Sequence, residues 1–146
     1  MKKVTLILVC LFTVCAGVLR ADNDRPIQVN QLPQAAQQFI KQHFADKKVA
    51  LAKVETELIH KGYEVAFTDG THIDFDRKGN WEEIECKGSN VPTAIIPDKI
   101  MDYVRENYPD VTVKKIEKDY REYEVKLSNR IELSFSLSGK LTDIDM

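Results

Sequence analysis

Cysteine is scarce in this chain, which limits how its fold can be stabilised. The 146 residues include three cysteines, and Cys10 and Cys15 lie in an N-terminal segment that we expect to be removed on export. Cys86 would then be the only thiol, so no internal disulfide can form. Stability must come from packing, and Cys86, which has no nucleophile signature around it, is predicted to be a half-buried apolar residue.

The chain also lacks an apolar run long enough to span a membrane. Lys2 and Lys3 precede a short apolar stretch, and small residues surround a cleavage position after Ala21, with a position near Ala16 as the alternative. Neither cysteine of this stretch follows the small residue that a lipoprotein signal requires. We therefore predict a signal peptide at residues 1–21, no stable membrane anchor, and a periplasmic or secreted mature protein.

An excess of basic charge is missing as well. After removal of the signal, 18 basic residues remain against 23 acidic ones. A net negative chain does not suit the phosphate backbone of nucleic acid or an anionic membrane surface. We therefore expect no nucleic-acid partner and look for a partner among envelope or secreted proteins, with the oligomeric state left open.

Signatures of catalysis are absent from the sequence. It contains no Gly-x-Ser-x-Gly, no phosphate-binding loop and no dinucleotide fingerprint. His43, His60 and His72 are not spaced as metal ligands and are best interpreted as polar surface residues. We predict that the protein is not an enzyme and has no catalytic residue, cofactor or metal site.

What the sequence does contain is a duplication. Residues 63–86 align without a gap on residues 123–146 at an offset of sixty, and six of the 24 positions are identical, where about one or two would match by chance. A unit this small buries little of its own surface, so two copies should share one body. The identical pairs are Tyr63/Tyr123, Glu64/Glu124, Val65/Val125, Phe75/Phe135, Gly79/Gly139 and Ile84/Ile144.

Each copy begins with a helical pattern. Apolar residues recur at helical spacing from Ala36 to Phe44 and again from Ile100 to Tyr108, and each run follows a proline that suits the first helical position. We expect the matched positions Phe39, Ile40, Tyr103 and Val104 to face the core. After each helix the period changes to two, and glycine-containing turns separate four short strands. The pattern predicts α-β-β-β-β in both copies.

We therefore predict an α+β fold of two tandem repeats, at residues 31–90 and 91–146, with both helices on one face of antiparallel sheet. Residues 22–30 form a leader segment that is either loose or an edge strand. The strands form either one continuous eight-stranded sheet or two abutting four-stranded sheets, and the sequence leaves both arrangements open.

The repeat resembles that of a known family. The residues that carry the resemblance are Tyr63, Val65, Phe67, Asp69-Gly70, Ile73, Phe75-Asp76, Gly79, Trp81 and Ile84. They resemble the repeat of the PepSY-like family of exported bacterial proteins, which is likened to the β-lactamase-inhibitor protein. The second copy departs from the pattern at Arg130 and Leu141. The resemblance implies a helix-on-sheet repeat with a binding or inhibitory role outside the cytoplasm, and it implies no catalytic residues.

One segment is spaced like a calcium-binding loop. Asp74, Asp76 and Glu85 stand at ligand positions with Gly79 at the turn, but Lys78 places a cation where a ligand belongs. The segment also spans a predicted hairpin rather than a helix–loop–helix. We expect these carboxylates not to form a calcium site.

The remaining candidates are surface residues. Trp81, Tyr120 and Arg121 are of the types that anchor protein interfaces, and all three lie beside predicted strand ends. They are the candidate protein-binding residues of an exported non-enzymatic binding module that binds a protein or inhibits a hydrolase. The alternative is a periplasmic protein that binds a small ligand or divalent cation through its acidic hairpins. For any single residue, the simpler interpretation is a solvated sheet with cross-strand charge pairs.

Overall fold

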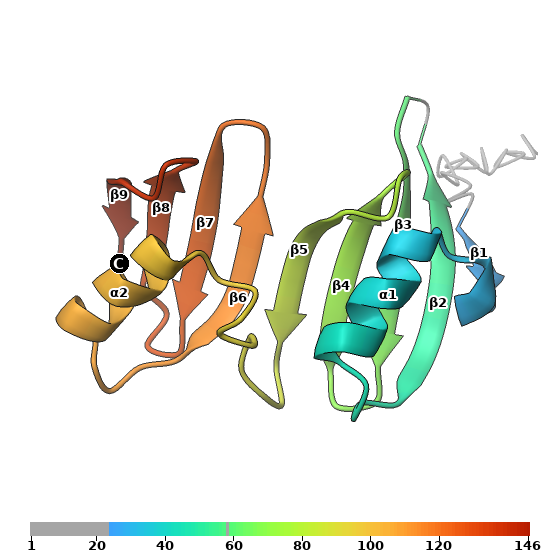
Figure 1. The fold of residues 1–146 in the computed structure, drawn as a ribbon, viewed down its shortest axis with the longest axis horizontal. Coiled ribbons are helices and arrows are strands. Elements are labelled where there is room, and N and C mark those ends of the chain that lie inside the picture. Colours follow the sequence, from blue (N-terminus) through green and yellow to red (C-terminus); the bar gives the residue numbers. More distant parts are fainter. Residues whose placement is uncertain (1–23, 58) are drawn as a thin grey trace, which may run out of the picture.

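The computed structural model describes residues 24–57 and 59–146, so the predicted signal peptide lies outside the described residues. Two helices and nine strands follow one another along the chain (Figure 1). The elements are β1 (Arg25–Ile27), a 3-10 turn (Val29–Gln31), α1 (Gln34–His43), β2 (Val49–Thr56), β3 (Lys61–Phe67), β4 (Thr71–Asp76), β5 (Trp81–Cys86), α2 (Asp98–Asn107), β6 (Val113–Lys118), β7 (Glu122–Leu127), β8 (Glu132–Ser136) and β9 (Leu141–Asp145).

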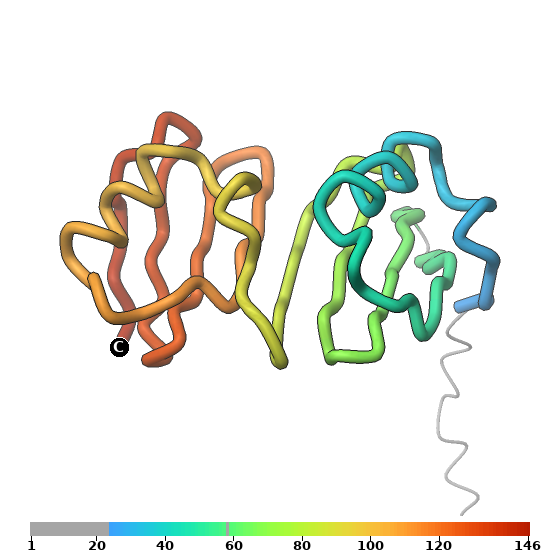
Figure 2. Tube along the Cα trace, turned by 60° about the horizontal axis from the view of Figure 1, so that its bottom comes forward, coloured from blue at the N-terminus to red at the C-terminus, as the bar shows by residue number. Residues whose placement is uncertain are grey.

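The strands form one continuous antiparallel sheet in sequence order from β1 to β9. Of the two arrangements left open by the sequence, the structure shows the single sheet, and β1 of the leader adds a ninth strand at its edge. Both helices lie on the same face of the sheet, α1 over the first repeat and α2 over the second (Figure 2). The predicted α+β architecture of two helix-and-four-strand repeats is confirmed.

Both helices begin directly after a proline. Pro33 and Pro97 share a φ of −52° and stand one position before the first helical residue, a small shift from the predicted start. Their carbonyl oxygens accept the first helical hydrogen bonds, from Gln37 at 3.1 Å and Met101 at 3.0 Å. Proline suits this place because the missing N–H would have had no helical partner.

The matched glycines mark where a hairpin turn touches its own helix. Gly79 and Gly139 adopt φ values of 89° and 85°, which favour glycine. A Cβ atom at Gly79 would lie 2.8 Å from Pro33, and one at Gly139 would lie 2.7 Å from Lys99, so each turn packs closely on the start of a helix. Where the second copy lacks its other turn glycine, Arg130 keeps a φ of 74°. The turn is therefore retained at some backbone strain.

A single hydrophobic core runs beneath both helices. The buried helix positions are Ala36 and Ile40 in α1 and Ile100 and Val104 in α2. Phe39 and Tyr103, predicted to face the core, are only partly buried and pack at its margin; Tyr103 makes an edge-to-face contact with Phe135. Cys86 is more buried than predicted, with 1% of its surface exposed. Among the described residues, no helix is long and apolar enough to cross a bilayer.

The two repeats are joined by the pairing of β5 with β6, which we call the seam. Three register pairs make it, Glu83 with Glu117, Ile84 with Ile116, and Glu85 with Lys115. Both isoleucines are fully buried, so the core passes through the seam without interruption. The two halves therefore share one body.

Replacement of Ile84 by alanine should destabilise the whole molecule, because it removes a buried contact between the repeats. We expect a loss of about 2–5 kcal/mol in the free energy of unfolding, in a single transition. The matched control is Ile144→Ala, at the equivalent place in the second copy but 42% exposed, which should cost about 1 kcal/mol. Denaturant unfolding followed by circular dichroism measures both, and two separate wild-type transitions would contradict a shared body.

Candidate functional site

A row of acidic side chains crosses the sheet on the face opposite the helices. Five carboxylates stand directly opposite one another from β3 to β7; these five, the carboxylate row, are Glu64, Asp74, Glu83, Glu117 and Glu124. Side chains in such cross-strand positions have Cβ atoms about 5 Å apart, and like charges placed there repel. The row crosses the seam, so neither repeat contains it alone.

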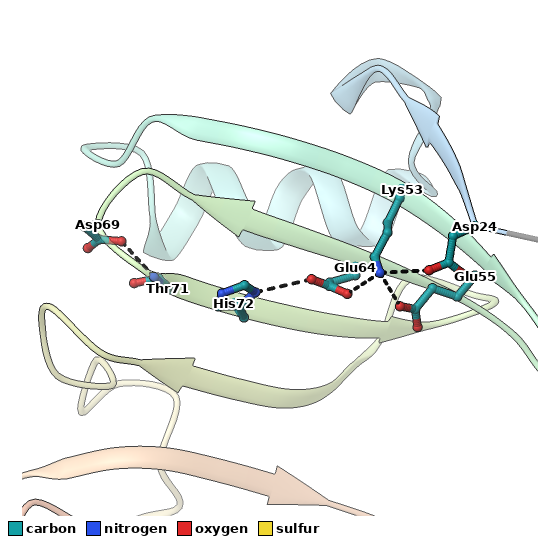
Figure 3. A network of polar contacts seen from close by, with 7 residues as sticks. All are labelled: Asp24, Lys53, Glu55, Glu64, Asp69, Thr71 and His72. Carbon is teal, nitrogen blue, oxygen red and sulfur yellow. Dashed lines mark hydrogen bonds and ion pairs between the residues drawn. The ribbon is translucent and has the colours of Figure 1, made fainter. Parts of the chain in front are cut away.

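Lys53 neutralises the first end of the row. Its ammonium lies 2.8 Å from Glu64, 2.9 Å from Glu55 and 2.9 Å from Asp24 (Figure 3). The hydrogen bond with Glu64 holds the pKa of Lys53 above its usual range. Burial alone would raise the pKa of Glu64, but the bond from Lys53 lowers it. His72 adds a contact of 3.2 Å to the same carboxylate, so this end of the row is well compensated.

Lys115 neutralises part of the carboxylate row at the seam. Its ammonium lies 3.1 Å from Glu83 on β5 and 3.5 Å from Glu117 on its own strand. Burial would lower the pKa of Lys115, but the hydrogen bond with Glu83 and the charge of both glutamates raise it. One lysine thus serves two carboxylates that belong to different repeats.

Among the described residues, no lysine or arginine forms an ion pair with Asp74 or Glu124, in contrast to Glu64 and Glu83. Burial, followed by the charges of Glu83 and Glu64, raises the pKa of Asp74 to about 7. Burial, followed by the charge of Glu117, also raises the pKa of Glu124. Two lysines of the described residues thus pair with a row of five carboxylates, which leaves the row with an excess of acidic groups.

The duplication explains why equivalent glutamates differ. Glu64 and Glu124 occupy the same place in the two copies, but Lys53 stands opposite Glu64 whereas Glu117 stands opposite Glu124. A lysine in the first copy is thus replaced by a glutamate in the second. Together with His72 beside Glu64, where the second copy has Glu132 beside Glu124, this difference gives the two matched carboxyls pKa shifts of opposite direction.

An open cleft of about 570 Å³ adjoins the row where β5 and β6 diverge beyond their last pair. The strands separate toward Trp81 and Lys118, at the end where the β6–β7 turn stands (Figure 1). We call this the seam cleft. Its lining residues are His60, Asp74, Asp76, Asn80, Trp81, Glu82, Glu83, Glu117, Lys118, Asp119 and Tyr120.

Aromatic and acidic groups meet in this cleft. The Lys118 ammonium lies over the Trp81 ring, 4.8 Å from its centroid. Tyr120 is 82% exposed at the rim. Such a combination of ring faces and carboxylates attracts cationic groups, because the ring face is the negative pole of the aromatic quadrupole.

The structure brings two of the three predicted binding residues together. Trp81 and Tyr120 line the seam cleft from opposite repeats, although they lie 39 positions apart in the sequence. Arg121 lies beside the cleft rather than in it, 5.3 Å from the Tyr120 ring, and pairs with Asp119 at 3.8 Å. Sequence reasoning missed Lys118 and the seam carboxylates, because only the β5–β6 register shows that they are neighbours.

The segment that resembles a calcium loop is a hairpin turn. The Asp76 carboxylate accepts hydrogen bonds from the backbone N–H groups of Lys78 at 2.8 Å and Asn80 at 2.9 Å, and from the Asn80 side chain at 3.0 Å. Burial opposes the effect, but these bonds lower the pKa of Asp76. Glu85 is not part of the carboxylate row; it stands opposite Lys115 on β6 and opposite His72 on β4. Within residues 24–57 and 59–146, no three acidic, histidine or cysteine side chains converge as a metal site.

Comparisons with known proteins agree with this architecture. A family model described as "Putative beta-lactamase-inhibitor-like, PepSY-like" matches residues 21–60 and 61–143. The chain is 62% identical to a "putative calcium-regulated periplasmic protein" of Bacteroides thetaiotaomicron, whose structure superposes with a TM-score of 0.85 over 86% of this chain and 99% of that one. No curated protein matches the chain.

A second solved structure, a "putative periplasmic protein" of Bacteroides vulgatus, is 56% identical, with a TM-score of 0.83 over 86% of this chain and 99% of that one. A third, from the same species and of unknown function, is 37% identical, with a TM-score of 0.80 over 84% and 99% of the respective chains. The predicted periplasmic location is confirmed by these relatives, and none of them indicates an enzymatic family.

Asp74 should make the stability of the protein depend on pH. A carboxyl with a pKa near 4 when unfolded and about 7 when folded stabilises the native state below pH 4, and this contribution is lost as the pH rises to 7. Asp74→Asn should therefore be more stable than the wild type at pH 8, by roughly 2 kcal/mol because partial solvation reduces the effect, and no more stable at pH 4. Urea unfolding between these pH values measures the difference.

The control for this experiment is Asp143→Asn, at the exposed far end of the same cross-strand line. It should keep the pH profile of the wild type. If Asp74→Asn also kept that profile, the Asp74 carboxyl would have an ordinary pKa and the proposed charge imbalance would be wrong.

Proposed function

The chain belongs to the beta-lactamase-inhibitor-like, PepSY-like family, and on that premise we propose that it is a periplasmic, non-enzymatic binding module. It binds a protein partner through the seam cleft and the carboxylate row beside it. The observation that carries the proposal is the seam cleft itself, in which Trp81 and Tyr120 stand among carboxylates from both repeats.

The chemistry of the cleft favours a cationic group of the partner. Lys118 already places an ammonium over the Trp81 ring, which marks where a lysine or arginine side chain can be held. The row supplies negative charge that Lys53 and Lys115 do not balance. A basic loop of a partner protein would relieve this repulsion, so association would be steered by charge.

The position of the cleft suits a partner of protein size. It lies at the middle of the strand order, so a partner on the polar face contacts both repeats at once. We expect the aromatic anchors Trp81 and Tyr120 to contribute more binding free energy than the surrounding charges. Exposed ion pairs contribute about 0–1 kcal/mol each, whereas loss of an aromatic anchor buried in an interface often costs more than 2 kcal/mol. The family description favours a hydrolase as the partner. The acidic charge of the row favours a hydrolase that presents a basic loop.

Loss of either aromatic anchor should abolish capture of the partner. On the immobilised mature chain, a specific envelope or secreted protein should be retained by the wild type and weakened about 30-fold or more by Trp81→Ala or Tyr120→Ala. The control is Leu137→Ala, which removes an apolar side chain that is 53% exposed in a distant turn. Folding of each variant is checked by circular dichroism.

Salt provides a second measurement on the same partner. Raising the ionic strength should weaken capture, because the row and the basic loop attract each other across water. Equal retention by the wild type and both anchor variants would contradict the proposed site, whatever protein is retained.

A second candidate function is binding of a divalent cation that would have to draw carboxylates of the row together, because no three of them converge as a metal site in the described structure. Two observations favour it: Asp74 and Glu124 are flanked by other carboxylates, and a relative that is 62% identical is described as calcium-regulated. Oxygen ligands of this kind are those that Ca²⁺ prefers. The row shares Asp74 with the segment that resembles a calcium loop, but its other carboxylates lie on different strands. Asp76 of that segment holds the hairpin turn and is not part of the row.

Calorimetry separates the two functions. If the row binds calcium, titration should give saturable heat that disappears in Asp74→Asn and persists in the control Glu132→Gln, whose side chain is paired with Lys126 outside the row. Absence of saturable heat in the wild type would remove this candidate and leave the protein-binding proposal untouched.

A further inference from the structure

The outer edge of β9 is one of the two edges of the sheet. Among residues 24–57 and 59–146, β9 is last in the strand order and pairs only with β8. The unpaired backbone groups of such an edge can hydrogen-bond an added strand. This edge lies at the far end of the sheet from the leader strand and well apart from the seam (Figure 1).

The duplication shows what covers the same edge in the first copy. β9 is the counterpart of β5, and β6 pairs along the outer edge of β5. There Ile116 stands opposite Ile84, which is 0% exposed, whereas its counterpart Ile144 is 42% exposed. The difference arises because, in the part of the chain that the structure describes, no strand continues the core beyond β9. The second copy thus retains the surface on which the first copy receives a strand.

From this equivalence we infer that the outer edge of β9 binds an extended segment of a partner polypeptide as an additional antiparallel strand. The site is distinct from the seam cleft and does not depend on it. Transfer of the β5–β6 register places an apolar residue opposite Ile144. Asp145 is the counterpart of Glu85, which pairs with Lys115 in the first copy. Asp143 is the counterpart of Glu83, which pairs with Glu117. The added strand therefore has one residue opposite each of these two aspartates.

The acidic side chains of β9 favour an added strand with basic residues opposite them. Asp143 and Asp145 are exposed on the polar face of β9, and opposite charges in directly opposed positions stabilise strand pairing. The segment that fits is therefore basic–apolar–basic. A second copy of β9 does not fit: in an antiparallel pairing centred on Ile144, Asp143 of each copy would meet Asp145 of the other.

The test uses a peptide made from the protein's own β6. A synthetic peptide with the sequence of residues 112–119, in which Glu117 is replaced by lysine, carries Lys-Ile-Lys at the three register positions. It is titrated into the isotope-labelled mature chain, and amide chemical shifts and hydrogen exchange are recorded. We expect shifts and slowed exchange in Leu141–Asp145.

Charge reversal and anchor variants make the result specific. Asp143→Lys combined with Asp145→Lys should weaken binding of the basic peptide about tenfold and strengthen binding of a peptide with glutamates at the two lysine positions. Trp81→Ala should leave binding unchanged, which separates this site from the proposed function. Equal effects of a scrambled peptide, or shifts confined to the carboxylate row, would overturn the inference.

Discussion

The pairing of β5 with β6 is the contact on which the rest of the structure depends. Three register pairs join the two copies, and the buried Ile84–Ile116 pair carries the hydrophobic core from one to the other. Each copy alone would be too small to bury much of its apolar surface. The same three pairs bring Glu83 beside Glu117 and so connect the acidic residues of the two repeats into one row.

The polar face shows the consequence of that junction. Packing on the helix side is continuous, whereas the opposite side gathers five carboxylates in adjacent positions. Like charges in such positions reduce stability, and the second copy increases the repulsion because Glu117 occupies the place of Lys53. Burial of the hydrophobic core on the other face of the sheet offsets the cost of this repulsion. A face that is unfavourable in isolation and favourable with a cationic partner is suited to binding.

Much of the architecture could be predicted from the sequence, because local chemistry determines it. The matched glycines, the prolines before both helices and the alternating apolar residues specify two helix-and-four-strand units. The sequence could not decide between one sheet and two, because β5 and β6 are separated by α2 and no turn residue sets their register. Burial was predicted less well at Phe39 and Tyr103, since helical periodicity does not distinguish the centre of a core from its margin.

The candidate site was predicted in its residue types and not in its arrangement. Trp81 and Tyr120 were identifiable as possible anchors, yet their shared cleft exists only through the seam. The sequence did not indicate that the carboxylates of the row lie side by side. Only the cross-strand register between distant segments aligns Glu64, Glu117 and Glu124. The imbalance at Asp74 likewise follows from neighbours on three different strands.

If the seam unites both copies in one body, Ile84 and Ile116 are energetically coupled, and a double-mutant cycle across the seam measures this coupling. The free energies of unfolding of the wild type, Ile84→Ala, Ile116→Ala and the double variant are compared. Direct contact predicts a coupling energy of about 1 kcal/mol or more, because the second truncation costs less once the first has removed their contact. Additive losses, with no coupling between the two isoleucines, would contradict the account.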